Sequence, residues 1–131
     1  MKRVVIESPY AGYVDRNVAY ARQAMRDSLE RGEAPIASHL IYTQPGILRD
    51  HVLSERELGI SAGFAWWSVA DLIVFYTDLG WSPGMTKALA RCMDEHRAFE
   101  VRNIISGRVW NSDEGLMADA VLDGGTNRKP T

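Results

Sequence analysis

Three short segments of this 131-residue chain carry side chains that could do chemistry. They are residues 8–12, 39–42 and 78–85, and each follows an apolar run that is typical of a buried strand. In open α/β sheets, ligands bind beyond the carboxyl ends of the parallel strands. If the three runs are parallel strands, the three segments meet at one edge of the sheet and form one site.

The third segment offers the best anion site. Ser82 can cap a helix and Pro83 suits its first position, so a hydroxyl, free backbone N–H groups and the positive end of the helix lie together. Gly84 would let a ligand approach closely, and Met85 follows it. An ordinary helix cap explains the same residues, so both interpretations stay open.

Three carboxylates are candidates for a catalytic group: Glu7, Asp78 and Glu57. Asp78 ends the central apolar run, where it could accept hydrogen bonds from a sugar or base, although loop aspartates often bond their own backbone. Glu7 lies just before the first segment. Glu57 is a spare carboxylate, because a capping box with Ser54 already explains it.

The remaining candidates are expected to contact a ligand. Tyr10 could stack on a base or pack as an ordinary aromatic side chain. His39 could act as an acid–base group, although a lone histidine is more often structural. Asn17 begins the first helix and faces residues 8–12. The predicted ligand-binding set is Ser8, Tyr10, Gly12, Asn17, His39, Tyr42, Asp78, Ser82, Gly84 and Met85.

The elements that must position these residues alternate between strands and helices. Apolar residues recurring every three or four places predict helices over 15–31, 54–69 and from 83 onward, with Asp15 capping the first. Apolar runs predict strands at 4–6, 34–38, 71–77 and 99–104, and a long irregular stretch from 39 to 52. This order predicts one three-layer α/β domain with a mostly parallel sheet of four or five strands, flavodoxin-like or Rossmann-like.

The helix predicted over 54–69 is apolar on two sides. One side suits a core and comprises Leu58, Ala62, Ala65 and Val69. The other side contains Ile60, Phe64 and Trp67, and in so small a domain we expect it to form a subunit contact. We therefore expect a homo-oligomer, a dimer or larger.

The α/β domain is expected to span residues 1–107, followed by a C-terminal tail over 108–131 that is partly disordered. Within the tail, Trp110 could anchor the chain and residues 116–122 could form one short helix.

The composition of the chain argues against several classes of partner and cofactor. The net charge of −2 gives no reason to expect a nucleic acid polymer as partner, and no apolar run is long enough for a membrane helix. Three scattered histidines and one cysteine have no metal-ligand spacing, so we expect no metal and no cofactor. The lone cysteine and the early polar residues of the N-terminus favour a cytoplasmic protein.

A resemblance to a known family rests on residues 8–12, Asn17, His39 and residues 78–85. Over residues 3 to about 104, the chain resembles the nucleoside 2-deoxyribosyltransferase superfamily. The chain looks most similar to a branch of small phage and bacterial proteins. The resemblance implies that a nucleoside or 5′-nucleotide lies across the sheet edge, that Tyr10 contacts the base, and that Ser82 and Gly84 bind the 5′-phosphate. It also implies oligomers, in which a partner completes each site, and a glutamate in the following helix that attacks the anomeric carbon.

The sequence departs from this superfamily at the attacking glutamate, whose position is occupied by Ala88. One hypothesis is an enzyme that hydrolyses or transfers the N-glycosidic bond of a (deoxy)nucleoside 5′-monophosphate with another carboxylate, namely Glu7, Asp78 or Glu57. The alternative is a non-catalytic protein that binds or sequesters a nucleotide-derived signal. A third hypothesis is an interaction module that uses Phe64, Trp66 and Trp67.

Overall fold

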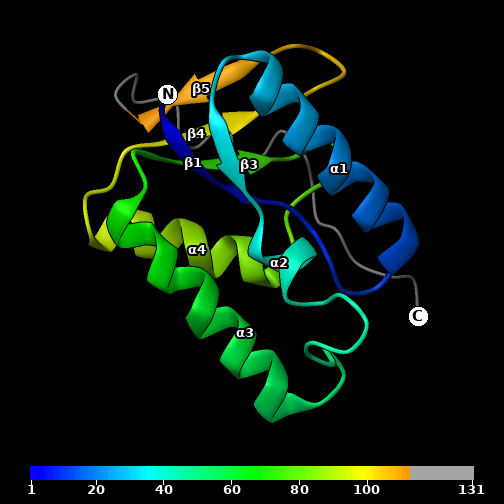
Figure 1. Ribbon diagram of the computed structural model, residues 1–131. Helices are drawn as coiled ribbons and strands as arrows, with labels where there is room; N and C mark the ends of the chain where they lie inside the picture. Colours follow the sequence, from blue (N-terminus) through cyan, green and yellow to red (C-terminus); the bar gives the residue numbers. More distant parts are fainter. Residues whose placement is uncertain (113–131) are drawn as a thin grey trace.

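A computed structural model of the chain describes residues 1–112. Its centre is a five-stranded sheet in the order β2-β1-β3-β4-β5 (Figure 1). The strands are β1 (Arg3–Glu7), β2 (Ala34–Ile36), β3 (Leu72–Tyr76), β4 (Phe99–Arg102) and β5 (Val109–Asn111). The first four pair in parallel and β5 runs antiparallel to β4. This is the flavodoxin-like strand order, and it confirms the predicted fold class.

Helices cover both faces of the sheet, α1 on one side and α3 and α4 on the other (Figure 1). The helices are α1 (Val14–Glu30), α2 (Ser38–Ile41), α3 (Leu53–Ala65), the 3₁₀ turn η1 (Trp66–Val69) and α4 (Pro83–Asp94). The continuous apolar run of β3 is buried throughout because both faces are covered. Leu72, Val74 and Tyr76 pack in the cluster that includes α1, whereas Ile73 and Phe75 pack in the cluster that includes α4.

Two predicted helix starts differ from the structure. Helix α1 begins at Val14 with Tyr13 as its N-cap residue, so Asp15 lies inside the first turn and does not cap it. Helix α3 begins at Leu53 after Val52, without a side-chain cap. Ser54 and Glu57 are therefore both helical, and the predicted capping box does not form. The prediction placed the start one residue late because Ser54 has the chemistry of a cap but not the required extended backbone.

The two apolar sides of residues 53–69 are also used differently from the prediction. Trp67 is 1% exposed and belongs to the core, where its ring lies 5.0 Å from that of Phe64, which also packs against this core cluster. On the side assigned to the core, Leu58 is 60% exposed, Val69 is 47% exposed and Ala65 is exposed. The side assigned to the core is thus largely at the surface, and Trp67 forms no subunit contact.

The irregular stretch predicted from residue 39 begins with the short helix α2, and β4 ends at Arg102 rather than at residue 104. β5 lies beyond the boundary predicted at residue 107 and pairs with β4. Trp110 in β5 is buried in the core cluster on the α4 side of the sheet. It therefore holds this part of the chain in place, as predicted. The helix predicted over 116–122 lies outside the described residues.

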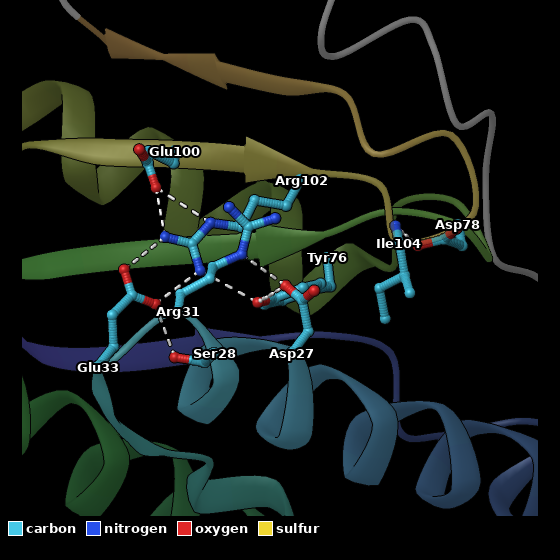
Figure 2. Close-up of polar contacts among 9 residues, drawn as sticks. All are labelled: Asp27, Ser28, Arg31, Glu33, Tyr76, Asp78, Glu100, Arg102 and Ile104. Atoms are coloured by element: carbon cyan, nitrogen blue, oxygen red, sulfur yellow. Dashed lines mark hydrogen bonds and ion pairs between the residues drawn. The ribbon is translucent and has the colours of Figure 1, made fainter.

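A buried ionic network fastens the carboxyl-terminal end of α1 to β3 and β4 (Figure 2). The guanidinium of Arg102 donates paired hydrogen bonds to both carboxylate oxygens of Glu33, each at 2.8 Å, and two to Glu100, at 2.5 and 3.0 Å. Tyr76 donates a hydrogen bond to Asp27 at 2.8 Å. These contacts satisfy the buried charges locally, as a stable structure requires.

Within residues 1–112, no helix is long and apolar enough to span a bilayer.

Candidate functional site

A cavity of about 550 Å³ opens beside the carboxyl edge of the sheet. Its walls come from the end of β1 and the loop behind it, from α2 and the segment that follows, from α3, and from the first turns of α4. The predicted residues that line it are Glu7, Ser8, Tyr10, Gly12, His39, Tyr42, Ser82, Gly84 and Met85. The three sequence segments therefore meet at one place, as the parallel sheet requires.

Glu7 reaches the cavity because of strand alternation. Val5 packs in the cluster that includes α4, and Glu7, two residues further along β1, points to the same face. The indole N–H of Trp67 is directed toward the Glu7 carboxyl, and within residues 1–112 the carboxyl forms no salt bridge. Burial raises the pKa of Glu7 to about 7, and the nearby Trp67 indole opposes this shift only in part.

The negative charge of Glu7 acts on Cys92, in the middle of α4. Burial, with a contribution from the negative charge of Glu7, raises the pKa of Cys92 to about 12. Cys92 is one turn beyond Ala88 on the same buried face of α4, and Ala88 is 1% exposed within the core. A carboxyl from β1 therefore approaches the region where α4 itself has none.

Ser8 and His39 form a second polar group in the cavity. Ser8 Oγ and His39 Nε2 are 2.7 Å apart, which joins the end of β1 to the start of α2. Ser8 is buried, and burial lowers the pKa of His39 to about 4. The imidazole is therefore neutral at physiological pH.

The start of α4 forms the opposite wall. Ser82 Oγ accepts a hydrogen bond from the backbone N–H of Met85 at 3.2 Å, with Pro83 in the first turn, so the predicted helix cap is confirmed. Ser82, Gly84 and Lys87 line the cavity. The positive end of the helix dipole and a lysine thus lie on one side of the cavity.

Aromatic side chains complete the walls. Tyr10, Tyr42 and Phe64 line the cavity. Tyr42 is held by a 2.9 Å hydrogen bond from the Trp66 indole, and the Arg91 guanidinium lies 4.3 Å from the centre of the Phe64 ring. Flat apolar surfaces of this kind suit a nucleobase or another planar group.

Three predicted site residues do not line the cavity. Asp78 accepts a hydrogen bond from the backbone N–H of Ile104 at 2.8 Å (Figure 2). It also accepts hydrogen bonds from the Tyr20 hydroxyl and, at 3.0 Å, from the backbone N–H of Ile105. Its oxygens therefore hold α1 and the chain after β4. Glu57 lies on the exposed side of α3.

Asn17 is the third of these residues, and it holds the backbone of a loop whose side chains line the cavity. Its side-chain amide donates to the carbonyl oxygens of Tyr10 and Ala11 at 2.9 and 3.1 Å. The prediction that it faces the first loop is confirmed, but the amide fixes this loop instead of lining the cavity.

Sequence reasoning missed the contribution of α3. Gly59 and Gly63 lie one turn apart on its cavity side, and Arg56 and Lys87 add positive charge from α3 and α4. The glycine spacing of four within a helix was a usable signal, because such a pattern marks one smooth face.

Among the described residues, no group of three histidine, cysteine, aspartate or glutamate side chains is arranged to hold a metal ion.

Comparisons with known proteins agree with the fold. A family described as a domain of unknown function (DUF7768) matches residues 2–102. No curated protein matches the sequence. Among solved structures, a 2-deoxyribosyltransferase from Bacillus psychrosaccharolyticus is similar, with a TM-score of 0.53 and 15% identity over 94% of this chain and 82% of that chain. At this identity the likeness shows a shared fold.

Proposed function

Because this chain belongs to the DUF7768 family, a domain of unknown function, we propose its activity from the cavity: it binds a nucleoside 5′-monophosphate, and Glu7 assists cleavage of the N-glycosidic bond. The observation that carries the proposal is the Glu7 carboxyl, which lines a cavity of about 550 Å³ and forms no salt bridge with the described residues. That volume lies within the range of about 300–1,000 Å³ that is usual for small-ligand sites.

The walls of the cavity match the parts of a nucleotide. Tyr10, Tyr42 and Phe64 offer surfaces for a base, and the start of α4 offers the Gly84 N–H and, with Lys87, positive charge for a phosphate. A carboxyl with a pKa of about 7 is substantially protonated near neutral pH. It can therefore donate a proton to the departing base, which is a difficult leaving group without one.

The test is release of free base from a panel of nucleosides and 5′-monophosphates, followed by chromatography. We expect release from a 5′-monophosphate, and a loss of about 10²–10⁴-fold in kcat for Glu7→Gln, because the amide keeps the size but donates no acidic proton. Glu57→Gln is the matched control, since Glu57 is exposed and outside the cavity. Equal rates in the Glu7 and Glu57 variants would exclude the role of Glu7.

A second candidate function is binding without turnover, and the core position of Ala88 favours it. A protein of this kind would retain the phosphate-binding helix start and lack the attacking glutamate. In that case a nucleotide raises the melting temperature of the wild-type protein while no base is released, even on prolonged incubation.

We also propose that the protein forms a homodimer through α3 and η1. Leu53, Leu58, Ile60, Trp66 and Val69 are each between 44% and 71% exposed. Such a collection of exposed apolar side chains along one helical segment is typical of a protein contact.

A further inference from the structure

The Ser8–His39 pair is the feature of the cavity that the proposed function leaves unused. Both residues line the cavity, and their side chains are 2.7 Å apart. The backbone carbonyl of His39 accepts a hydrogen bond of 2.5 Å from Thr43 Oγ1, which helps to fix α2. The pair is therefore held by two elements, and a hydroxyl with capacity for one more hydrogen bond lies at the cavity wall.

The protonation state of the pair is suited to accepting a proton. His39 is enclosed by protein and its pKa is lowered to about 4, so one ring nitrogen carries a lone pair at neutral pH. When Nε2 is that nitrogen, Ser8 donates its hydroxyl hydrogen to the ring, and the Ser8 oxygen can accept a hydrogen bond from a water molecule. The same geometry of hydroxyl and imidazole activates oxygen nucleophiles in many enzymes.

We propose that Ser8 and His39 take the proton from the water that attacks the anomeric carbon, so that the N-glycosidic bond is hydrolysed in a single displacement. This inference rests on the proposed function. It assigns the attacking group to water instead of a protein carboxylate, which accounts for Ala88 at the position where the superfamily carries a glutamate.

The step balances as follows in atoms and charge. The water oxygen forms a bond to the anomeric carbon as the bond from that carbon to the base nitrogen breaks. The bonding electron pair leaves with the base, and the Glu7 carboxyl donates its proton to the base. The water proton moves to Ser8 Oγ while the Ser8 hydroxyl proton moves to His39 Nε2. His39 then returns a proton to Glu7 through solvent, so the free base and the sugar phosphate are the only products.

The positions of Glu7 and of the Ser8–His39 pair support these separate roles as acid and base. Glu7 and Ser8 are consecutive, so their side chains leave the chain in different directions at the end of β1. One group is protonated near neutral pH and the other is an unprotonated base, because burial acts in opposite directions on a carboxyl and an imidazole. Pairs of groups whose pKa values are moved apart in this way supply the acid and the base in glycoside hydrolysis.

The pH dependence of the reaction reflects all ionisable groups around the cavity. These come from β1 and its loop, from the segment after α2, from α3 and from α4, and are Glu7, Tyr10, His39, Tyr42, Asp50, Glu55, Arg56 and Lys87. With His39 as base and Glu7 as acid, kcat rises with pH through about 4 and falls above about 7.

The experiment compares Ser8→Ala and His39→Gln with wild type, using His51→Gln as a matched control because His51 is exposed and outside the cavity. We expect both pair variants to lower kcat by about 10²-fold or more while nucleotide affinity, measured by calorimetry, changes little. The limb of the pH profile near 4 disappears in His39→Gln. Early proton NMR spectra show the inverted, α-configured sugar phosphate from a β-nucleotide.

Three results would overturn the inference. These are a retained β-configuration, exchange of the released base for a second base, or unchanged kcat in both variants with base release intact. Each of them leaves the proposed function standing. If wild type binds nucleotides and releases no base, the proposed cleavage and this inference both fail, and binding without turnover is the function.

Discussion

At the residue scale, the environment of Glu7 sets it apart from the other carboxylates. Asp78 has three donors and Glu33 has a guanidinium, whereas Glu7 lines the cavity beside the Trp67 indole and forms no salt bridge with the described residues. Burial of a carboxyl in this way costs stability whenever the group is ionised. Such a position is typical of a functional group, because a purely structural site would carry an apolar side chain.

Stability should therefore depend on the ionisation of Glu7. Its pKa is about 7 when folded and near 4.5 when unfolded, so the folded state binds the extra proton between these values. Stability is then lost as the pH rises from about 5 to 8, by up to about 3 kcal/mol. Thermal unfolding of Glu7→Gln should show a smaller decline over this range than wild type. Parallel curves for the two proteins would contradict the raised pKa.

At the element scale, the position of α3 shapes the cavity, and Gly63 allows α3 to approach α2. A Cβ added to Gly63 would lie 2.6 Å from Ser38 Oγ and 3.0 Å from Ser38 Cβ. A Cβ added to Gly59 would meet only the end of the Leu48 side chain, at 3.2 Å. The two glycines thus differ in what surrounds them, although they occupy equivalent turns of the same helix.

We expect Gly63→Ala to destabilise the protein by about 1–3 kcal/mol, because α2 or α3 must shift to relieve the clash. Gly59→Ala is the control, and should be near neutral because the gain in helix propensity offsets a small side-chain movement. Chemical denaturation measures both effects. Adding Ser38→Ala to Gly63→Ala should recover part of the loss, and no recovery would mean that the Ser38 hydroxyl is not the obstacle.

The helix boundaries show where local sequence patterns are insufficient. Ser54 and Glu57 have the spacing of a capping box, yet Val52 is the N-cap residue and the helix begins at Leu53. Similarly, Ile60, Phe64 and Trp67 share one side of a helical pattern, but Phe64 and Trp67 pack against the core while Ile60 is 49% exposed. Which apolar side of a helix meets the sheet depends on how the helix packs, and the local pattern does not show it.

At the scale of the whole molecule, the exposed apolar side chains of α3 and η1 predict self-association. We expect light scattering to give the mass of a dimer for wild type and of a monomer for Leu58→Glu. A charge in an apolar contact is costly, whereas on a free surface it would be tolerated. Glu57→Lys is an appropriate control because Glu57 is adjacent and already polar. Wild type that elutes as a monomer would exclude the proposed dimer.

The sequence alone determined the architecture, because alternation between helices and strands depends on local periodicity and restricts the sheet to parallel crossovers. It also placed residues 8–12, 39–42 and 78–85 at one edge, because the carboxyl ends of parallel strands coincide. The tertiary structure alone decided which of these side chains remain free. Asp78 accepts hydrogen bonds from Tyr20 and from the chain after β4, Ser8 pairs with His39, and Glu7 lies beside the Trp67 indole without a salt bridge to the described residues. These partners are distant in sequence, and only the packing of the folded chain brings them together.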